Sequence, residues 1–360
     1  MNTLSININE AVTAVKTIGV TNTILLRGQP GIGKSSILKM LAREMPDYHA
    51  VYVDVATLDI GDLGMPIIDH ENRVTHFAPS SRFGIRTDLL KGNRPLIVML
   101  DELGKASSKA VLNSLLPLVL EKRLVTEYLP AGSIVIATTN LDTDGVGDII
   151  PPHAYDRMTV CVMRNPTADE WLIWAGNNDI APEVQAFAKQ YPSVFQCYTE
   201  LAEKQKNPHI YNPLTGNTQE YCTPRGLAKA SNIVKARAVL GSAYLPLLAG
   251  TIGAPAARDL DAIVSMADDI PLFDRMVSEP DKCPIPKSAG ALFVMAFMLV
   301  GRVSAETMDA VMTYANRIKD VSFEAHSLFV MTLATNESKV GMACRNREFT
   351  KACAELGKYF

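Results

Sequence analysis

The residues with the clearest capacity for chemistry lie in one glycine-rich segment, residues 28–35, which reads GQPGIGKS. Its glycines allow backbone N–H groups to close around phosphate oxygens, and a helix that begins after the segment adds a favourable dipole. Within this pattern we expect Lys34 to reach the β- and γ-phosphates of a nucleotide and the Ser35 hydroxyl to ligate Mg²⁺. We therefore predict that the nucleotide is bound by Gly28, Gln29, Pro30, Gly31, Ile32, Gly33, Lys34, Ser35 and Ser36.

Two acidic residues directly follow an apolar run, residues 96–100, which reads LIVML. Because such a run is typical of a buried strand, Asp101 and Glu102 are expected at a strand end. There Asp101 would hold Mg²⁺ through its water shell, and Glu102 would act as general base on the attacking water. Surface turns after core strands also carry carboxylates, so this interpretation depends on the glycine-rich segment in the same chain.

Two further polar residues are candidates for the same reaction. Asn140 follows a second apolar run, residues 133–138, and its amide could orient the water against the γ-phosphate. An asparagine here could equally cap the next turn. Arg157 lies in the segment PPHAYDRM, residues 151–158, and its planar, permanently charged fork could donate to a phosphate held by another subunit. The alternative is an ordinary surface ion pair with Asp156.

The elements that must position these residues alternate in the first half of the chain. Strand-like segments are expected at residues 21–27, 50–55, 96–100 and 133–138, and helix-like segments at 35–44 and 106–120. This alternation predicts a parallel α/β sheet. After residue 166 strand-like runs disappear, and alanine, leucine and methionine recur at helical spacing instead.

Composition limits the remaining possibilities. The 360 residues are 48% hydrophobic and 20% charged, with a net charge of −3, which excludes disordered, collagen-like and low-complexity chains. The six cysteines and six histidines lack the spacing of a metal site. No signal peptide is recognised, and the longest apolar run, residues 289–301, is too short to span a bilayer. We expect a cytoplasmic protein without a membrane span.

The order of these motifs resembles one family, the AAA+ ATPases, and within it the MoxR-like branch. The glycine-rich segment, the strand ending in Asp101 and Glu102, the strand ending in TTN and the sequence AYDRM succeed one another as in that family. Residues 59–64 and 67–77 resemble the helix-2 insert of MoxR, dynein-related and McrB-like modules. Residues 120–125 and 129–132 resemble the hairpin before sensor 1, and Thr223-Pro224-Arg225 is similar to the sensor 2 motif of the helical lid.

The resemblance implies an α/β fold: a P-loop AAA+ parallel-sheet core with an α-helical lid and a C-terminal helical segment. The implied domains are a nucleotide-binding core at residues 1–163, a helical lid at 164–268 and a C-terminal helical extension at 269–360. It also implies Mg²⁺-dependent ATP hydrolysis in a homo-oligomeric ring, expected to be a hexamer. In that ring Glu102, Asn140, Arg157 and Arg225 would be catalytic, while Ser35 and Asp101 would hold the metal.

The resemblance further implies a function in which ATP hydrolysis remodels or activates a partner protein, expected to be of the von Willebrand factor A type. The alternative is a nucleic-acid-associated motor similar to McrB-like enzymes, which requires a basic surface. The insert at residues 59–77 is acidic instead, although a basic cluster could form from Lys91, Arg94, Lys122 and Arg123. A third hypothesis, a nucleotide switch that does not hydrolyse, conflicts with the complete set Lys34, Asp101, Glu102 and Asn140.

Overall fold

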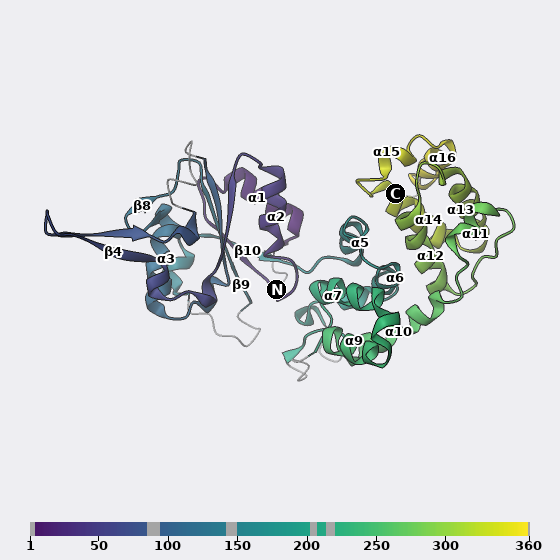
Figure 1. Ribbon diagram of the computed structural model, residues 1–360, viewed down its shortest axis with the longest axis horizontal. Helices are drawn as coiled ribbons and strands as arrows, with labels where there is room; N and C mark the ends of the chain where they lie inside the picture. Colours follow the sequence, from purple (N-terminus) through teal and green to yellow (C-terminus); the bar gives the residue numbers. More distant parts are fainter. Residues whose placement is uncertain (1–3, 85–93, 142–149, 202–206, 214–219, 359–360) are drawn as a thin grey trace. The chain divides into compact units, whose positions relative to one another are not determined.

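The computed structural model describes residues 4–84, 94–141, 150–201, 207–213 and 220–358. The chain divides into two compact units, Met1–Asn165 and Pro166–Phe360. The first unit is built on a β-sheet and the second is helical, as Figure 1 shows with the element labels used below. The predicted fold class, a P-loop α/β core followed by helices, is confirmed.

A six-stranded parallel sheet forms the centre of the first unit among the described residues. Across the sheet the order is β1 (Ser5–Ile6), β10 (Thr159–Met163), β2 (Ile24–Arg27), β9 (Ile134–Thr139), β6 (Leu96–Asp101) and β3 (His49–Asp54). The four strands expected from sequence are β2, β3, β6 and β9, and the structure adds β1 and β10 on one side. The carboxyl ends of β2, β6 and β9, which carry the predicted site residues, therefore share one edge.

Helices cover both faces of this sheet. Ile24 and Leu26 of β2 pack in one buried cluster with α1 (Ile8–Ile18) and α2 (Ser36–Glu44). Leu25 points to the opposite face, into a cluster with α3 (Lys109–Glu121). The short α4 (Pro152–Tyr155) also contributes to that second cluster. Because both faces are buried, these strands read as nearly continuous apolar runs.

The predicted helix at residues 106–120 begins later than expected, at Lys109. The Ser108 side chain accepts a hydrogen bond from the backbone N–H of Val111 and so caps the helix start. Just before it, Leu103–Lys105 forms a single 3₁₀ turn. Pro117 lies inside α3, which continues to Glu121.

Two antiparallel hairpins accompany the sheet in the described part of the first unit. β4 (Gly64–Asp69) pairs with β5 (Val74–Pro79), and β7 (Arg123–Leu124) pairs with β8 (Glu127–Tyr128). We call residues 64–79 the β4–β5 arm; Figure 1 shows it extending away from the body of the unit. The hairpins touch, because the Thr126 hydroxyl donates to the Phe77 carbonyl at 3.1 Å.

The second unit is helical throughout its described residues. Its helices are α5 (Ala168–Gly176), α6 (Pro182–Gln190), α7 (Pro224–Lys235), α8 (Arg237–Leu240), α9 (Tyr244–Ile252), α10 (Ala254–Ala267), α11 (Phe273–Ser278), α12 (Ala289–Arg302), α13 (Met308–Val321), α14 (Phe323–Ala334), α15 (Val340–Ala343) and α16 (Arg347–Leu356). One cluster of buried side chains runs from Trp171 to Leu356. It joins both the predicted lid and the predicted extension, so the boundary at residue 268 stays a prediction.

The apolar segment at residues 289–301 forms most of α12, whose side chains are buried on nearly every side. Within the described ranges no single helix combines the length and apolar character needed to cross a membrane. The pair Pro224–Lys235 and Arg237–Ile252 meets those criteria jointly by length and composition, but it is bent by 70°.

Candidate nucleotide-binding and hydrolysis site

The glycine-rich segment forms the loop between β2 and α2, and its glycines are required by its backbone. Gly31 and Gly33 have φ of 80° and 106°, a region that only glycine enters without strain. A Cβ on Gly28 would lie 2.6 Å from Ile32 Cδ1 and 2.9 Å from the Met163 carbonyl oxygen. The loop therefore packs so closely on the end of β10 that a side chain at residue 28 has no room.

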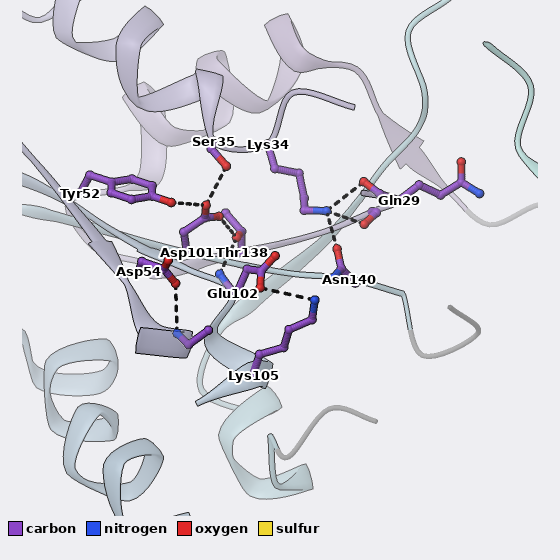
Figure 2. Close-up of polar contacts among 12 residues, drawn as sticks. Gln29, Lys34, Ser35, Tyr52, Asp54, Asp101, Glu102, Lys105, Thr138 and Asn140 are labelled. Atoms are coloured by element: carbon purple, nitrogen blue, oxygen red, sulfur yellow. Dashed lines mark hydrogen bonds and ion pairs between the residues drawn. The ribbon is translucent and has the colours of Figure 1, made fainter. Parts of the chain in front are cut away.

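Lys34 is buried, with 8% of its surface exposed, and its ammonium group lies at the centre of the loop. Its Nζ donates to the carbonyl oxygens of Gly28 at 2.5 Å and Gln29 at 3.0 Å, and to Asn140 Oδ1 at 3.0 Å (Figure 2). A buried ammonium needs such acceptors. Asn140 directly follows β9, so the sheet brings together two predicted residues that are far apart in sequence.

Asp101 ends β6 and is buried, and hydroxyl groups surround its carboxylate. Its Oδ2 accepts from Ser35 Oγ at 2.7 Å and from the Tyr52 hydroxyl at 2.8 Å, while its Oδ1 accepts from Thr138 Oγ1 (Figure 2). Burial and the hydrogen bond to Asp101 raise the pKa of Tyr52 well above its usual value, so the phenol keeps its proton and remains a donor.

Glu102 follows Asp101 in a left-handed backbone conformation, with φ 56° and ψ 44°. A residue with a Cβ adopts this conformation at a cost of about 1 kcal/mol. Its N–H donates to Thr138 Oγ1 at 3.1 Å, which fixes the turn. Its carboxylate is 41% exposed and lies 3.4 Å from Lys105 Nζ. A partly solvated carboxylate at this position is available to accept a proton from water.

The residues present fit a Mg²⁺–nucleotide complex. The Ser35 hydroxyl and Asp101 carboxylate offer the hard oxygen ligands that Mg²⁺ prefers. The buried Gln29 Nε2 has no hydrogen-bond partner among the described residues, as expected for a donor that awaits a ligand, while Gln29 Oε1 accepts from Asn165 Nδ2 at 2.9 Å. The histidines, cysteines and acids of the described ranges form no group of three that could hold a metal by themselves.

Arg157 lies away from this loop. It follows α4 and precedes β10, it is exposed, and it forms no ion pair with any described residue. The register pairs Thr159 with Ile24, at the start of β2, whereas the glycine-rich loop follows the end of that strand. The two ends are about 13 Å apart at the usual rise of a strand. Residues 142–149, in the segment between β9 and α4, lie outside the described residues.

Arg225 lies in the first turn of α7, in the second unit, and its side chain is exposed. The Thr223 hydroxyl accepts from the Gly226 N–H at 2.8 Å and caps this helix. The sequence Thr223-Pro224-Arg225 thus opens a helix, while any action of Arg225 on a nucleotide stays a prediction.

The hypothetical basic cluster is only partly described, because Lys91 lies outside the described residues. The cations of the other members are engaged by carbonyl groups: Arg94 donates to Pro46, Asp47 and Tyr48, and Lys122 to Ser133 at 2.6 Å. Arg123 donates to the Val125 carbonyl at 2.6 Å and pairs with Glu121. The three side chains therefore bind backbone carbonyl groups of the protein itself.

Sequence reasoning missed Tyr52 and Thr138. Tyr52 lies in the predicted strand AVYVDV, and Thr138 lies in the predicted strand before Asn140. The available signals were the position of Tyr52 between the buried residues Val51 and Val53, and the polar character of Thr138 at the end of an apolar run. Their contact with Asp101 depends on strand order and register, which the sequence alone does not determine.

A parallel sheet with a glycine-rich loop at the end of one strand and carboxylates at the end of another defines the class of P-loop nucleotide hydrolases. Comparison with known protein families finds a match within this class. Residues 24–164 match the family described as AAA, ATPase family associated with various cellular activities. Residues 24–164 of the first unit therefore form an AAA ATPase domain, the kind of domain found in ATP-hydrolysing P-loop ATPases.

No curated protein matches the chain by sequence. Among solved structures, a presumed ATPase from Cytophaga hutchinsonii is 21% identical, with a TM-score of 0.34 over 48% of this chain and 50% of that one. The chain thus spans about half the length of that protein. A RuvB mutant from Thermotoga maritima is 15% identical, with a TM-score of 0.38 over 87% and 85%. NtrX from Brucella abortus, solved with ADP, is 13% identical, with a TM-score of 0.39 over 87% and 64%.

Proposed function

We propose that this chain is a MoxR-like AAA+ ATPase that assembles into a homo-oligomeric ring, hexameric by the family resemblance. ATP hydrolysis in the ring would remodel or activate a partner protein, and the partner we propose is of the von Willebrand factor A type. The observation that carries the proposal is the β4–β5 arm, which is inserted between β3 and β6 of the AAA domain.

The β4–β5 arm exposes apolar side chains on both of its faces. The register places Met65, Ile67 and Val74 on one face and Ile68 and Phe77 on the other, each between 44% and 63% exposed. Contiguous exposed apolar side chains mark surfaces that contact another molecule. A two-stranded hairpin has no core of its own, so these side chains do not serve the stability of the sheet. This supports an arm that engages a protein.

The proposed reaction uses the residues at the strand ends. The glycine-rich loop and Lys34 would bind the ATP phosphates, and Ser35 and Asp101 would hold Mg²⁺. When bound, that ion would neutralise charge on the phosphates. Glu102 would take a proton from the attacking water, and Asn140 would orient that water towards the γ-phosphate.

Two arginines complete the proposed site from elsewhere. Arg157 would act on the nucleotide of a neighbouring subunit, where its fixed positive charge would stabilise the transition state. Arg225 would contribute from the helical lid, as the sensor 2 resemblance implies.

The charges of the arm favour a protein partner over nucleic acid. Its described acids, Asp69 and Glu71, outnumber its one arginine, Arg73. Phosphate backbones are bound chiefly by clustered lysine and arginine, and such a cluster is not seen among the described residues of the arm.

The test uses a Glu102→Gln variant, which should hold ATP without turnover. We expect it to form a stable complex with a purified von Willebrand factor A-type protein when ATP is present, and none with ADP. Light scattering measures the complex and the ring together. A complex with labelled double-stranded DNA that weakens steeply with salt, and none with the protein, would favour the McrB-like alternative instead.

A further inference from the structure

Tyr52 has an unusual position for a residue on an edge strand. Its ring is 51% exposed, yet its hydroxyl donates to Asp101 Oδ2 at 2.8 Å. The same oxygen accepts from Ser35 Oγ, so the tyrosine reaches into the proposed metal-binding pair (Figure 2).

Strand geometry explains why a tyrosine makes this contact. The register pairs Asp54 of β3 with Asp101 of β6, and Tyr52 precedes Asp54 by two residues on the same face. Its Cα therefore lies about 7 Å back along the strand from the level of Asp101. A tyrosine side chain covers that span and still ends in a hydroxyl, whereas a serine or threonine side chain is too short.

The Asp101 carboxylate is held from both neighbouring strands. β6 lies between β9 and β3; Thr138 of β9 donates to Oδ1 and Tyr52 of β3 donates to Oδ2. Both donors are neutral hydroxyl groups. They restrict the rotation of the carboxylate without cancelling its negative charge, whereas a lysine in the same place would compete with a divalent cation.

We propose that Tyr52 is a positioning residue that holds Asp101 in the orientation required for the Mg²⁺–nucleotide complex. In this role it would act through Asp101, to which its hydroxyl donates, and not directly on the nucleotide. The proposal rests on the role given to Asp101 in the proposed function.

The test measures nucleotide binding without turnover. A fluorescent ADP analogue is titrated at increasing Mg²⁺ concentration and, separately, with excess EDTA. Tyr52→Phe removes only the hydroxyl group, and we expect it to raise the half-saturating Mg²⁺ concentration about 5- to 10-fold, the loss typical of one intramolecular hydrogen bond. Binding in EDTA should be unchanged. In steady-state hydrolysis the Mg²⁺ requirement should rise while kcat at saturating Mg²⁺ stays within about twofold.

The matched control is Tyr48→Phe. Tyr48 lies just before β3, and its hydroxyl forms no hydrogen bond with any described residue, so its Mg²⁺ titration should match that of the unmodified chain. Asp101→Asn separates the two proposals. Two results would contradict the metal-binding role proposed for Asp101: an unchanged Mg²⁺ titration of Asp101→Asn, or Mg²⁺-independent binding of ADP by the unmodified chain. The positioning role proposed for Tyr52 would then be contradicted as well.

Two outcomes overturn the Tyr52 proposal alone. In the first, the Mg²⁺ titration of Tyr52→Phe equals that of the unmodified chain, whereas the titration of Asp101→Asn is shifted. The other is an equal loss of binding with and without Mg²⁺, or a thermal midpoint lowered well beyond that of Tyr48→Phe, because either would indicate a merely structural role.

Discussion

Lys34 and Glu102 are expected to fail in different ways when replaced. Lys34 is buried in the phosphate loop, so Lys34→Ala should remove ground-state binding and leave nucleotide affinity too weak to measure. As the proposed general base, Glu102 would act on water in the transition state, so Glu102→Gln should bind ATP with near-normal affinity and lose turnover about 100-fold or more. Equilibrium binding and steady-state hydrolysis measure the two effects. Hydrolysis by Glu102→Gln at the rate of the unmodified chain would show that another group is the base.

Thr138 connects the two acids of the site. Its fully buried hydroxyl donates to Asp101 Oδ1 and accepts from the Glu102 N–H. Thr138→Val keeps the shape and leaves both groups unsatisfied, so we expect the free energy of unfolding of the first unit to fall by about 2 kcal/mol. Urea denaturation measures this loss. Thr17→Val, at an exposed position on α1, is the control and should change stability by less than about 0.5 kcal/mol; equal effects would contradict the bridging role.

At the scale of elements, the central strands could be predicted because burial on both faces makes them continuous apolar runs. β1 is only two residues long, too short for any periodicity, and it exists because Ser5 and Ile6 pair with Val162 and Met163 of β10. Residues 224–240 have the spacing of one helix but form two, α7 and α8, divided after Lys235. Residues 271–286 have no regular spacing, yet they contain α11.

The candidate site also has contacts that the sequence could predict and contacts that it could not. Lys34, Asp101 and Asn140 could be placed together in advance, because the carboxyl ends of parallel strands meet at one edge. The contacts of Tyr52 and Thr138 required the strand order β9–β6–β3 and its register. No local sequence pattern determines the strand order or the register, because both follow from how the whole sheet assembles.

The β4–β5 arm is expected to couple hydrolysis to the partner without supporting the core. Because residues 67–77 are exposed and pack in no buried cluster of the unit, their deletion should leave ATP binding and the thermal midpoint nearly unchanged. Stimulation of hydrolysis by the partner protein should be lost. The control replaces residues 70–73 of the turn with Gly and Ser, which keeps both strands. Unfolding of the whole unit by the deletion would show instead that the segment is part of the core.

A buried histidine should make the second unit sensitive to acid. His326 of α14 is 2% exposed, and both of its ring nitrogens lack hydrogen-bond partners among the described residues. Burial, with a smaller contribution from Lys319, lowers its pKa below the usual 6.5, against the opposing effect of Glu355. The unfolded chain then binds the proton more readily, so stability is complete above about pH 6.5 and declines as the pH falls towards the lowered pKa.

Thermal unfolding of His326→Leu between pH 5 and 7.5 checks this expectation. Its midpoint should vary less with pH than that of the unmodified chain, because the leucine cannot bind a proton. His209→Gln is the matched control, since His209 is bonded to Asp259 at 2.9 Å. An unchanged pH dependence in His326→Leu would mean that other groups cause the acid sensitivity.

At the scale of the whole molecule, Arg157 provides the argument for assembly. It lies just before β10, at the end of the strands opposite to the end that carries the phosphate loop of its own chain. This placement of an exposed arginine supports our proposal that Arg157 acts on the nucleotide of a neighbouring copy. Such a contact can contribute about 10³-fold to the rate, because it meets charge that develops in the transition state.

Arg157→Ala should therefore bind ATP almost normally, assemble, and hydrolyse about 10³-fold more slowly. The sharper measurement mixes Arg157→Ala with Glu102→Gln, each nearly inactive alone. In a mixed assembly some interfaces join an intact Glu102 site to an intact Arg157 of the neighbour, so hydrolysis should partly return in proportion to those interfaces. Subunit exchange is verified independently by fluorescence energy transfer between labelled copies. If the subunits exchange and no hydrolysis returns, action between neighbours is contradicted, and full activity of Arg157→Ala alone would remove Arg157 from the reaction altogether.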